Sequence, residues 1–179
     1  DARLPYAMAM RHYARAVAYA QLRDRAGFEA ELEAMEGLAK SDGFADMVAQ
    51  GVPAPELVTL ANAVARGRMA AAHGRYDEAA GLYRQAIAIE RRIPYQEPPY
   101  WYYPVSQSLG GALFMAGRYA EASEAFRAAL VQTPHNAWAL YGLARSEDAL
   151  GRRAEAEAAR RAFARAWAGE PDWLRMERL

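Results

Sequence analysis

The chain has 179 residues, equal numbers of acidic and basic side chains, and a pI of about 7.1. This balance gives no whole-molecule electrostatic case for a nucleic-acid or membrane partner, and we expect neither. The sequence has no cysteine and no run of about 18 apolar residues, which excludes disulfides, thiolate zinc sites and a transmembrane helix. Because the chain opens at Asp1 rather than at methionine, we interpret it as a piece of a longer chain and assign no localisation.

Helix-forming residues dominate every part of the sequence. Alanine recurs through nearly every segment together with leucine, glutamate and arginine, all of which have high helix propensity. The alternation of β-branched residues that marks a half-buried strand is missing. The sequence therefore predicts an all-α chain.

The first predicted hairpin covers about residues 5–40, with an apolar stripe near the helical period and a turn at Gly27-Phe28. We interpret residues 12–45 as a degenerate repeat, because Glu31 stands where the later repeats have alanine.

Two insertions separate the predicted units that follow. Residues 46–59 contain Gly51, Pro53 and Pro55 and are longer than a plain helix–helix link needs. A unit at 60–93 comes next, with its turn at Gly74-Arg75-Tyr76. Residues 94–102 then hold three prolines and four aromatic residues, which favours an extended path.

The remaining chain is predicted to hold units at 103–136 and 137–170, and a capping segment at 171–179 that looks like the start of a helix. Turn markers support this registration: Tyr119 and Arg153 are 34 residues apart, and Tyr76 precedes Tyr119 by 43, which is one period plus the nine-residue insertion. The period is constant, and the extra length falls between units.

The clearest unit, 103–136, has small and large residues at fixed places in this period. Positions 7-8, 20, 24, 27 and 32 are Leu109-Gly110, Ala122, Phe126, Ala129 and Pro134. This pattern resembles the tetratricopeptide (TPR) repeat, a helix–turn–helix of 34 residues. The resemblance implies helical hairpins stacked into a right-handed superhelix (an α-solenoid). Residues 97–146 look more specifically like the C-terminal part of long bacterial TPR proteins of undefined function.

The resemblance also implies that residues at recurring first-helix positions line a concave face that binds a protein partner. At or beside these positions stand Arg68, Gln107, Phe114, Trp138, Tyr141, Arg145 and Asp148. Trp, Tyr and Arg are the residues that most often anchor binding. The alternative is that Trp138 and Tyr141 merely pack against the preceding repeat, as aromatic residues at helical spacing commonly do.

The aromatic insertion has two interpretations. Tyr100 and Trp101, with their aromatic neighbours, would form a ledge at the mouth of the groove, held by proline. Alternatively, the rings fold back and cover the gap that the insertion creates, which avoids a large exposed apolar patch.

No catalytic, cofactor or metal site is predicted. His12, His73 and His135 are isolated from any recognised ligand motif, and no nucleophile elbow or phosphate loop is present. We therefore do not expect an enzyme. Three functions stay open: a module that binds a peptide or helix of a partner protein, a scaffold that packs on upstream repeats or self-associates, and a non-catalytic C-terminal part of a larger enzyme or metalloprotein.

Overall fold

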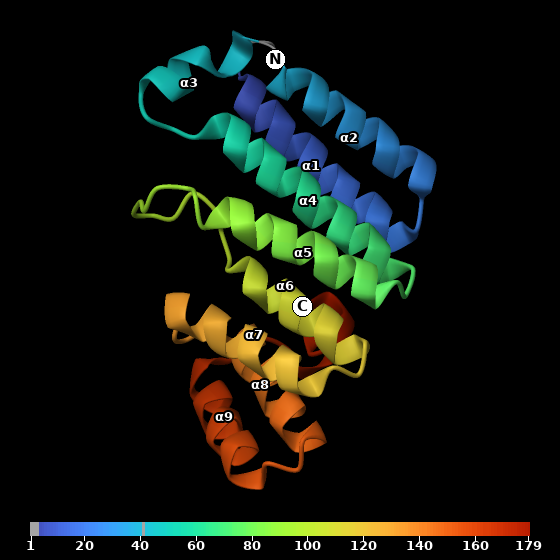
Figure 1. The fold of residues 1–179 in the computed structure, drawn as a ribbon, viewed down its shortest axis with the longest axis vertical. Helices are drawn as coiled ribbons and strands as arrows, with labels where there is room; N and C mark the ends of the chain where they lie inside the picture. Colours follow the sequence, from blue (N-terminus) through green and yellow to red (C-terminus); the bar gives the residue numbers. More distant parts are fainter. Residues whose placement is uncertain (1–3, 41) are drawn as a thin grey trace. The chain divides into compact units, whose positions relative to one another are not determined.

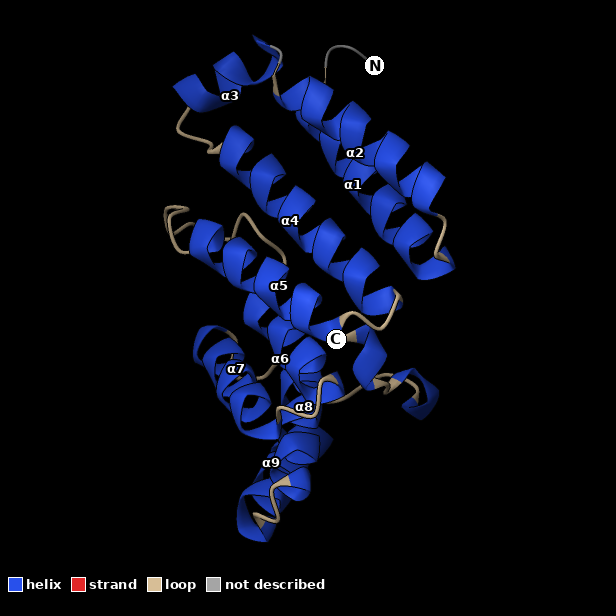
Figure 2. Cartoon of the chain, turned by 45° about the vertical axis from the view of Figure 1, so that its right-hand side comes forward, coloured by secondary structure: helices blue, strands red, loops and turns tan. Residues whose placement is uncertain are grey.

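The computed structural model describes residues 4–40 and 42–179, and every regular element in them is helical (Figure 2). The prediction of an all-α chain is confirmed. The α-helices, labelled in Figure 1, are α1 (Pro5–Leu22), α2 (Arg25–Ala39), α3 (Ala45–Ala49), α4 (Ala54–Ala72), α5 (Tyr76–Glu90), α6 (Val105–Met115), α7 (Tyr119–Gln132), α8 (Ala137–Ala149) and α9 (Arg153–Ala166). Single 3-10 turns are η1 (Asp42–Phe44), η2 (Pro171–Trp173) and η3 (Met176–Arg178).

The helices fall into two compact units. Unit 1 comprises residues 1–75 and 85–102, and unit 2 comprises residues 76–84 and 103–179. Helix α5 is thus divided between them. Each unit is described by itself below.

In unit 1, α1 forms a hairpin with α2, and α4 packs against both. All three lie side by side in Figure 1. Their shared core holds the largest buried side chains of this unit, among them Phe28, Leu32, Met35, Leu57 and Leu60. In α1 the buried residues are Ala9, Tyr13, Ala16 and Ala20, whereas Leu22, which the predicted stripe included, is exposed.

The turn of the first hairpin lies before the place expected from the sequence. Arg23 adopts a left-handed conformation with φ of 58°, and the Asp24 side chain caps α2 by accepting a 3.0 Å hydrogen bond from the amide of Gly27. A side-chain cap of this kind satisfies a free amide at the helix start. Gly27 and Phe28 therefore lie inside α2 rather than in the turn, and Phe28 is buried.

The connection to the next helix is also shorter than the predicted insertion at 46–59. Helix α4 begins at Ala54, before the predicted start of its repeat at residue 60. Pro53 is its N-cap and Pro55 lies in its first turn, where a missing amide hydrogen removes no helical hydrogen bond. The prolines that suggested a loop thus open a helix.

In unit 2, α6 pairs with α7 and α8 with α9, and α7 packs against α8. The first hairpin spans residues 105–132 and the second spans residues 137–166. Gly117 and Gly151 end the first helix of each hairpin with φ of 77° and 72°, a conformation that costs glycine little.

The Phe126 ring of α7 sets the spacing of the helices around it. A Cβ atom added to Gly110 of α6 would stand 2.7 Å from the ring, and one added to Gly142 of α8 only 2.2 Å. Phe126 itself is fully buried. Two helices therefore close directly onto one aromatic ring, and both need a residue without a side chain there.

Residues 171–179 do not form the expected start of a helix. They make two separate 3-10 turns, and the second, η3, packs against α6. The red C-terminal segment lies beside α6 in Figure 1. A segment this short gains too few hydrogen bonds to offset the cost of starting an α-helix, so its contacts with α6 decide its path.

The close contact at Phe126 can be tested with two matched glycine substitutions. We expect Gly142→Ala to destabilise unit 2 by about 1–3 kcal/mol, because the new methyl group would overlap the ring. Gly81→Ala is the control: it places a methyl where nothing lies within 4 Å, and helix propensity should make it stabilising by about 0.5–1 kcal/mol. Urea denaturation measures both, and equal midpoints for the two variants would contradict this packing.

Candidate partner-binding site

Three of the predicted partner-binding residues come together on one face of unit 2, where α6 and α8 pack against each other. Phe114 lies near the end of α6, and Tyr141 and Arg145 are one turn apart on α8. The Arg145 guanidinium carbon is 5.8 Å from the centre of the Phe114 ring and 5.9 Å from that of Tyr141. Arg145 also donates a 3.1 Å hydrogen bond to the Tyr141 hydroxyl.

These side chains line a cavity of about 320 Å³. Met115 of α6 adds apolar surface, and the C-terminal residues Leu174 to Glu177 complete the lining. The Tyr141 hydroxyl donates a 3.2 Å hydrogen bond to the carbonyl oxygen of Leu174. The site is thus built from two helices of the repeats and one segment outside them.

The C-terminal segment continues along α6 beyond the cavity. Met176 and Leu179 are buried there, only 5% and 3% exposed. Ser108 donates a 2.9 Å hydrogen bond to the main-chain oxygen of Leu179, and a Cβ atom on Gly111 would stand 2.9 Å from the Cβ atom of Leu179. Sequence reasoning missed this segment as part of the site, although its apolar spacing was visible.

The charge of Arg145 has no acidic counterpart in the residues that the structure describes. The side chain is exposed, and its contacts are the two rings and the Tyr141 hydroxyl. Arginine is weakly hydrated and stacks on aromatic rings while its remaining N–H groups stay available. The cavity therefore presents a positive charge held in a defined orientation.

The other predicted residues of unit 2 have partners within the fold. Gln107 is buried and accepts a 2.8 Å hydrogen bond from Asn136, the residue that caps α8. Asp148 accepts a 2.6 Å bond from Arg160. Trp138 is half-buried, with its ring centre 5.1 Å from that of Trp167 in an edge-to-face contact.

The predicted residues of unit 1 are no part of this cavity. Arg68 is half-buried on α4 and Tyr100 is half-buried in the aromatic insertion. Trp101 is only 7% exposed, with its ring centre 5.4 Å from that of Tyr13 on α1 and 5.1 Å from that of Tyr102. Trp101 thus packs inward against α1, whereas Tyr95 and Tyr102 of the same stretch are 85% and 71% exposed.

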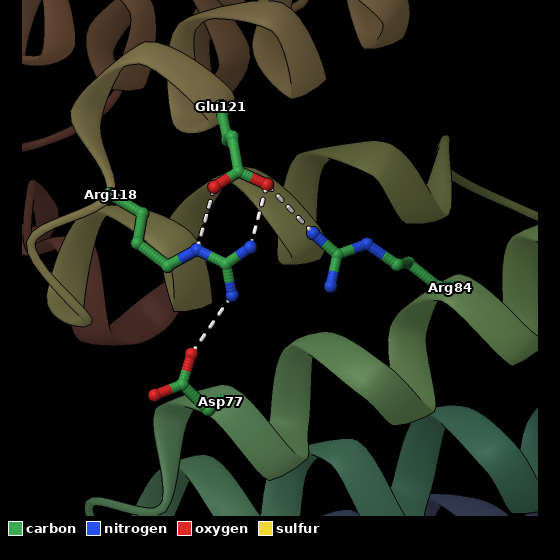
Figure 3. Close-up of polar contacts among 4 residues, drawn as sticks. All are labelled: Asp77, Arg84, Arg118 and Glu121. Atoms are coloured by element: carbon green, nitrogen blue, oxygen red, sulfur yellow. Dashed lines mark hydrogen bonds and ion pairs between the residues drawn. The ribbon is translucent and has the colours of Figure 1, made fainter.

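A surface ion-pair network links the N-terminal part of α5 to the start of α7 (Figure 3). Arg118 donates two 2.7 Å bonds to Glu121 and one of 2.9 Å to Asp77, and Arg84 donates a 3.1 Å bond to Glu121. The bonds from Arg118 lower the pKa of the Glu121 carboxyl. Because the carboxylates and cations satisfy each other, we assign this cluster to the internal cohesion of unit 2.

A buried carboxylate connects α7 to α8. Glu147 is completely buried and accepts hydrogen bonds from Ser123 and from Arg127, the latter at 2.7 Å, with Arg152 at 3.4 Å. Burial by itself raises the pKa of Glu147. The hydrogen bonds from Ser123 and Arg127 and the nearby positive charges lower this pKa by more than burial raises it, so it lies below its ordinary value. Sequence reasoning did not single out this residue.

Comparison with known proteins identifies the repeats. A family model described as tetratricopeptide repeat matches residues 113–162, from the end of α6 into α9. The recognition of a tetratricopeptide repeat is thereby confirmed, and the matched residues include Phe114, Tyr141 and Arg145. Searches of curated proteins and of solved structures returned no match.

The match concerns the repeat in residues 113–162 and gives no individual activity. Tetratricopeptide repeats generally mediate protein–protein interactions and are typically non-catalytic. In the described part of the chain, no helix is long and apolar enough to cross a membrane, and no group of three or more potential ligands could hold a metal ion.

The lowered pKa of Glu147 predicts how acid affects unit 2. A carboxyl whose pKa is depressed by folding stabilises the fold above its unfolded pKa of about 4.3, and this contribution is lost as the pH falls through the folded value. We expect Glu147→Gln to lower the free energy of unfolding by about 1–3 kcal/mol at neutral pH, and to flatten the loss of stability below about pH 4.3.

Urea denaturation across this pH range measures the effect. Glu124→Gln is a suitable control because Glu124 is exposed on the same helix as Ser123. Parallel pH profiles for Glu147→Gln and the unaltered chain would contradict the assignment.

Proposed function

We propose that unit 2 is a protein-binding module whose α6/α8 cavity takes a peptide segment with an acidic side chain next to apolar ones. The observation that carries the proposal is Arg145, held over Phe114 and Tyr141 at the edge of the cavity without an acidic counterpart among the described residues. The interaction role of the tetratricopeptide family supports it.

The chemistry of the cavity favours such a ligand. A carboxylate would receive charge-assisted hydrogen bonds from the guanidinium, which are shorter and stronger than neutral ones. Phe114 and Met115 supply apolar surface beside this charge. Because the Tyr141 hydroxyl already holds Arg145, the ligand would meet a side chain whose orientation is fixed in advance, which lowers the entropic cost of binding.

In this proposal, the other predicted residues of unit 2 extend the binding surface or hold its helices in place. Trp138 keeps part of its ring exposed on α8 and can extend the contact. Gln107 positions the start of α8 through Asn136, and Asp148 holds Arg160. In unit 1, Arg68 and Tyr100 remain candidate contacts of a second surface, while Trp101 supports Tyr102.

The proposal can be tested with short peptides selected from a random display library on the immobilised chain. We expect selected peptides to contain Asp or Glu beside apolar residues, because Arg145 offers the unpaired charge. Synthesised with a fluorescent label, they should bind the Arg145→Met variant about tenfold or more weakly, the effect of losing a hydrogen-bonded charge pair.

Arg161→Met is the matched control, since Arg161 is an exposed arginine paired with Glu157 on α9. Its affinity for the peptides should equal that of the unaltered chain. Peptides without acidic residues, or equal binding to the Arg145→Met variant, would overturn the assignment of Arg145.

A further inference from the structure

The α6 face of the proposed site already holds a peptide-like occupant, the chain's own residues 174–179. We propose that this segment is an internal ligand which competes with the partner, and that the partner peptide presents two apolar side chains spaced like Met176 and Leu179. The inference rests on the proposed function for the role of the cavity. It adds the spacing of apolar side chains that a partner peptide must have, and it names the chain's own segment as the occupant that the partner must displace.

The spacing of the two anchors follows from the local backbone. In a 3-10 turn, residues three apart lie on the same side, and η3 spans Met176–Arg178. Met176 and Leu179 are accordingly both buried, while Arg175, Glu177 and Arg178 between and beside them are exposed. A short segment with two apolar residues three apart is therefore sufficient to fill this face.

The receiving surface on α6 is shaped for these anchors. The three atoms nearest to a Cβ on Gly111 all belong to the segment: the Cβ and carbonyl carbon of Leu179 and the carbonyl oxygen of Met176, at 2.9 to 3.3 Å. Ser108, one turn before, donates its hydrogen bond to the main-chain oxygen of Leu179. Gly111 and Ser108 thus both contact the segment's backbone. Because these backbone contacts do not depend on the segment's side chains, another peptide can make them.

The segment lies outside the two helical hairpins of unit 2, and two of its side chains, Met176 and Leu179, are buried. Its main-chain amides donate local hydrogen bonds within two 3-10 turns, and Ser108 and Tyr141 each donate one hydrogen bond to its main-chain oxygens. Segments with few buried side chains open at low free energy compared with the core. Opening 174–179 would leave the α6–α7 and α8–α9 hairpins in place.

Charge gives a partner an advantage over the chain's own segment. Arg175 and Glu177 line the cavity together with Arg145, so the segment adds no net charge there and leaves Arg145 without an ion pair among the described residues. A peptide that places a carboxylate at Arg145 would gain an attraction that the internal segment lacks. Specificity then comes from the difference between the two occupants.

Fluorescence polarisation with a labelled peptide of residues 172–179, DWLRMERL, tests the competition directly. The chain carrying Met176→Ala and Leu179→Ala should bind this peptide about tenfold or more tightly than the unaltered chain, because an occupied site binds in proportion to its open fraction. Adding Gly111→Ala to that chain should abolish the gain, since the methyl group occupies the place of Leu179. Adding Gly81→Ala instead should leave it unchanged.

Limited trypsin digestion of the otherwise unaltered chain supplies a second readout. Gly111→Ala should speed cleavage after Arg175 by displacing the segment, whereas Gly81→Ala should not. Equal peptide affinities for the unaltered and doubly substituted chains, or no binding to the latter, overturn the proposal, as does cleavage that Gly111→Ala leaves unchanged. If acidic peptides still depend on Arg145 in that case, the proposed function stands and only the internal competition falls.

Discussion

Unit 2 depends on the contact of Phe126 with two glycines. Gly110 and Gly142 let α6 and α8 approach the same ring, and a Cβ atom at either place would overlap it unless the ring or a helix moved. The ring fixes how these first helices lie, and side chains near the two glycines converge. Phe114 is one turn after Gly110 on α6, while Tyr141 directly precedes Gly142 on α8 and Arg145 follows it by about one turn. The packing contact and the proposed binding site are therefore two consequences of one helix spacing.

Residues with a fixed place in the repeat could be predicted from the sequence. The hairpins of unit 2 and the group of Phe114, Tyr141 and Arg145 follow from a period in which small and large residues recur. Features set by single contacts could not: the turn before α2 depends on one cap by Asp24, and the buried Glu147 depends on donors from α7 and from the start of α9. The path of residues 174–179 is set by Gly111 and Ser108, about 70 residues earlier in the chain, beyond the reach of local pattern.

In each unit a segment outside the hairpins covers a first helix. Trp101 and Tyr102 of the insertion contact Tyr13 on α1, where the two tyrosine hydroxyls are 3.0 Å apart. In unit 2, Met176 and Leu179 cover α6. A helix face built of small and aromatic residues leaves apolar surface that water solvates poorly. Another segment of the same chain can cover this apolar surface. In unit 2, Arg145 and its charge lie beside the covering segment.

The most direct test of the account follows the methyl group of Met176 by NMR in a chain labelled with ¹³C at its seven methionines. Unlabelled peptide of residues 172–179 is added in excess, and the signals of Met176 and Met115 are identified by substitution. The account predicts that the Met176 signal moves to the position of a solvent-exposed methionine, while Met115, on the helix that receives the peptide, keeps a shifted signal. A Met176 signal that stays in place at saturating peptide would contradict it.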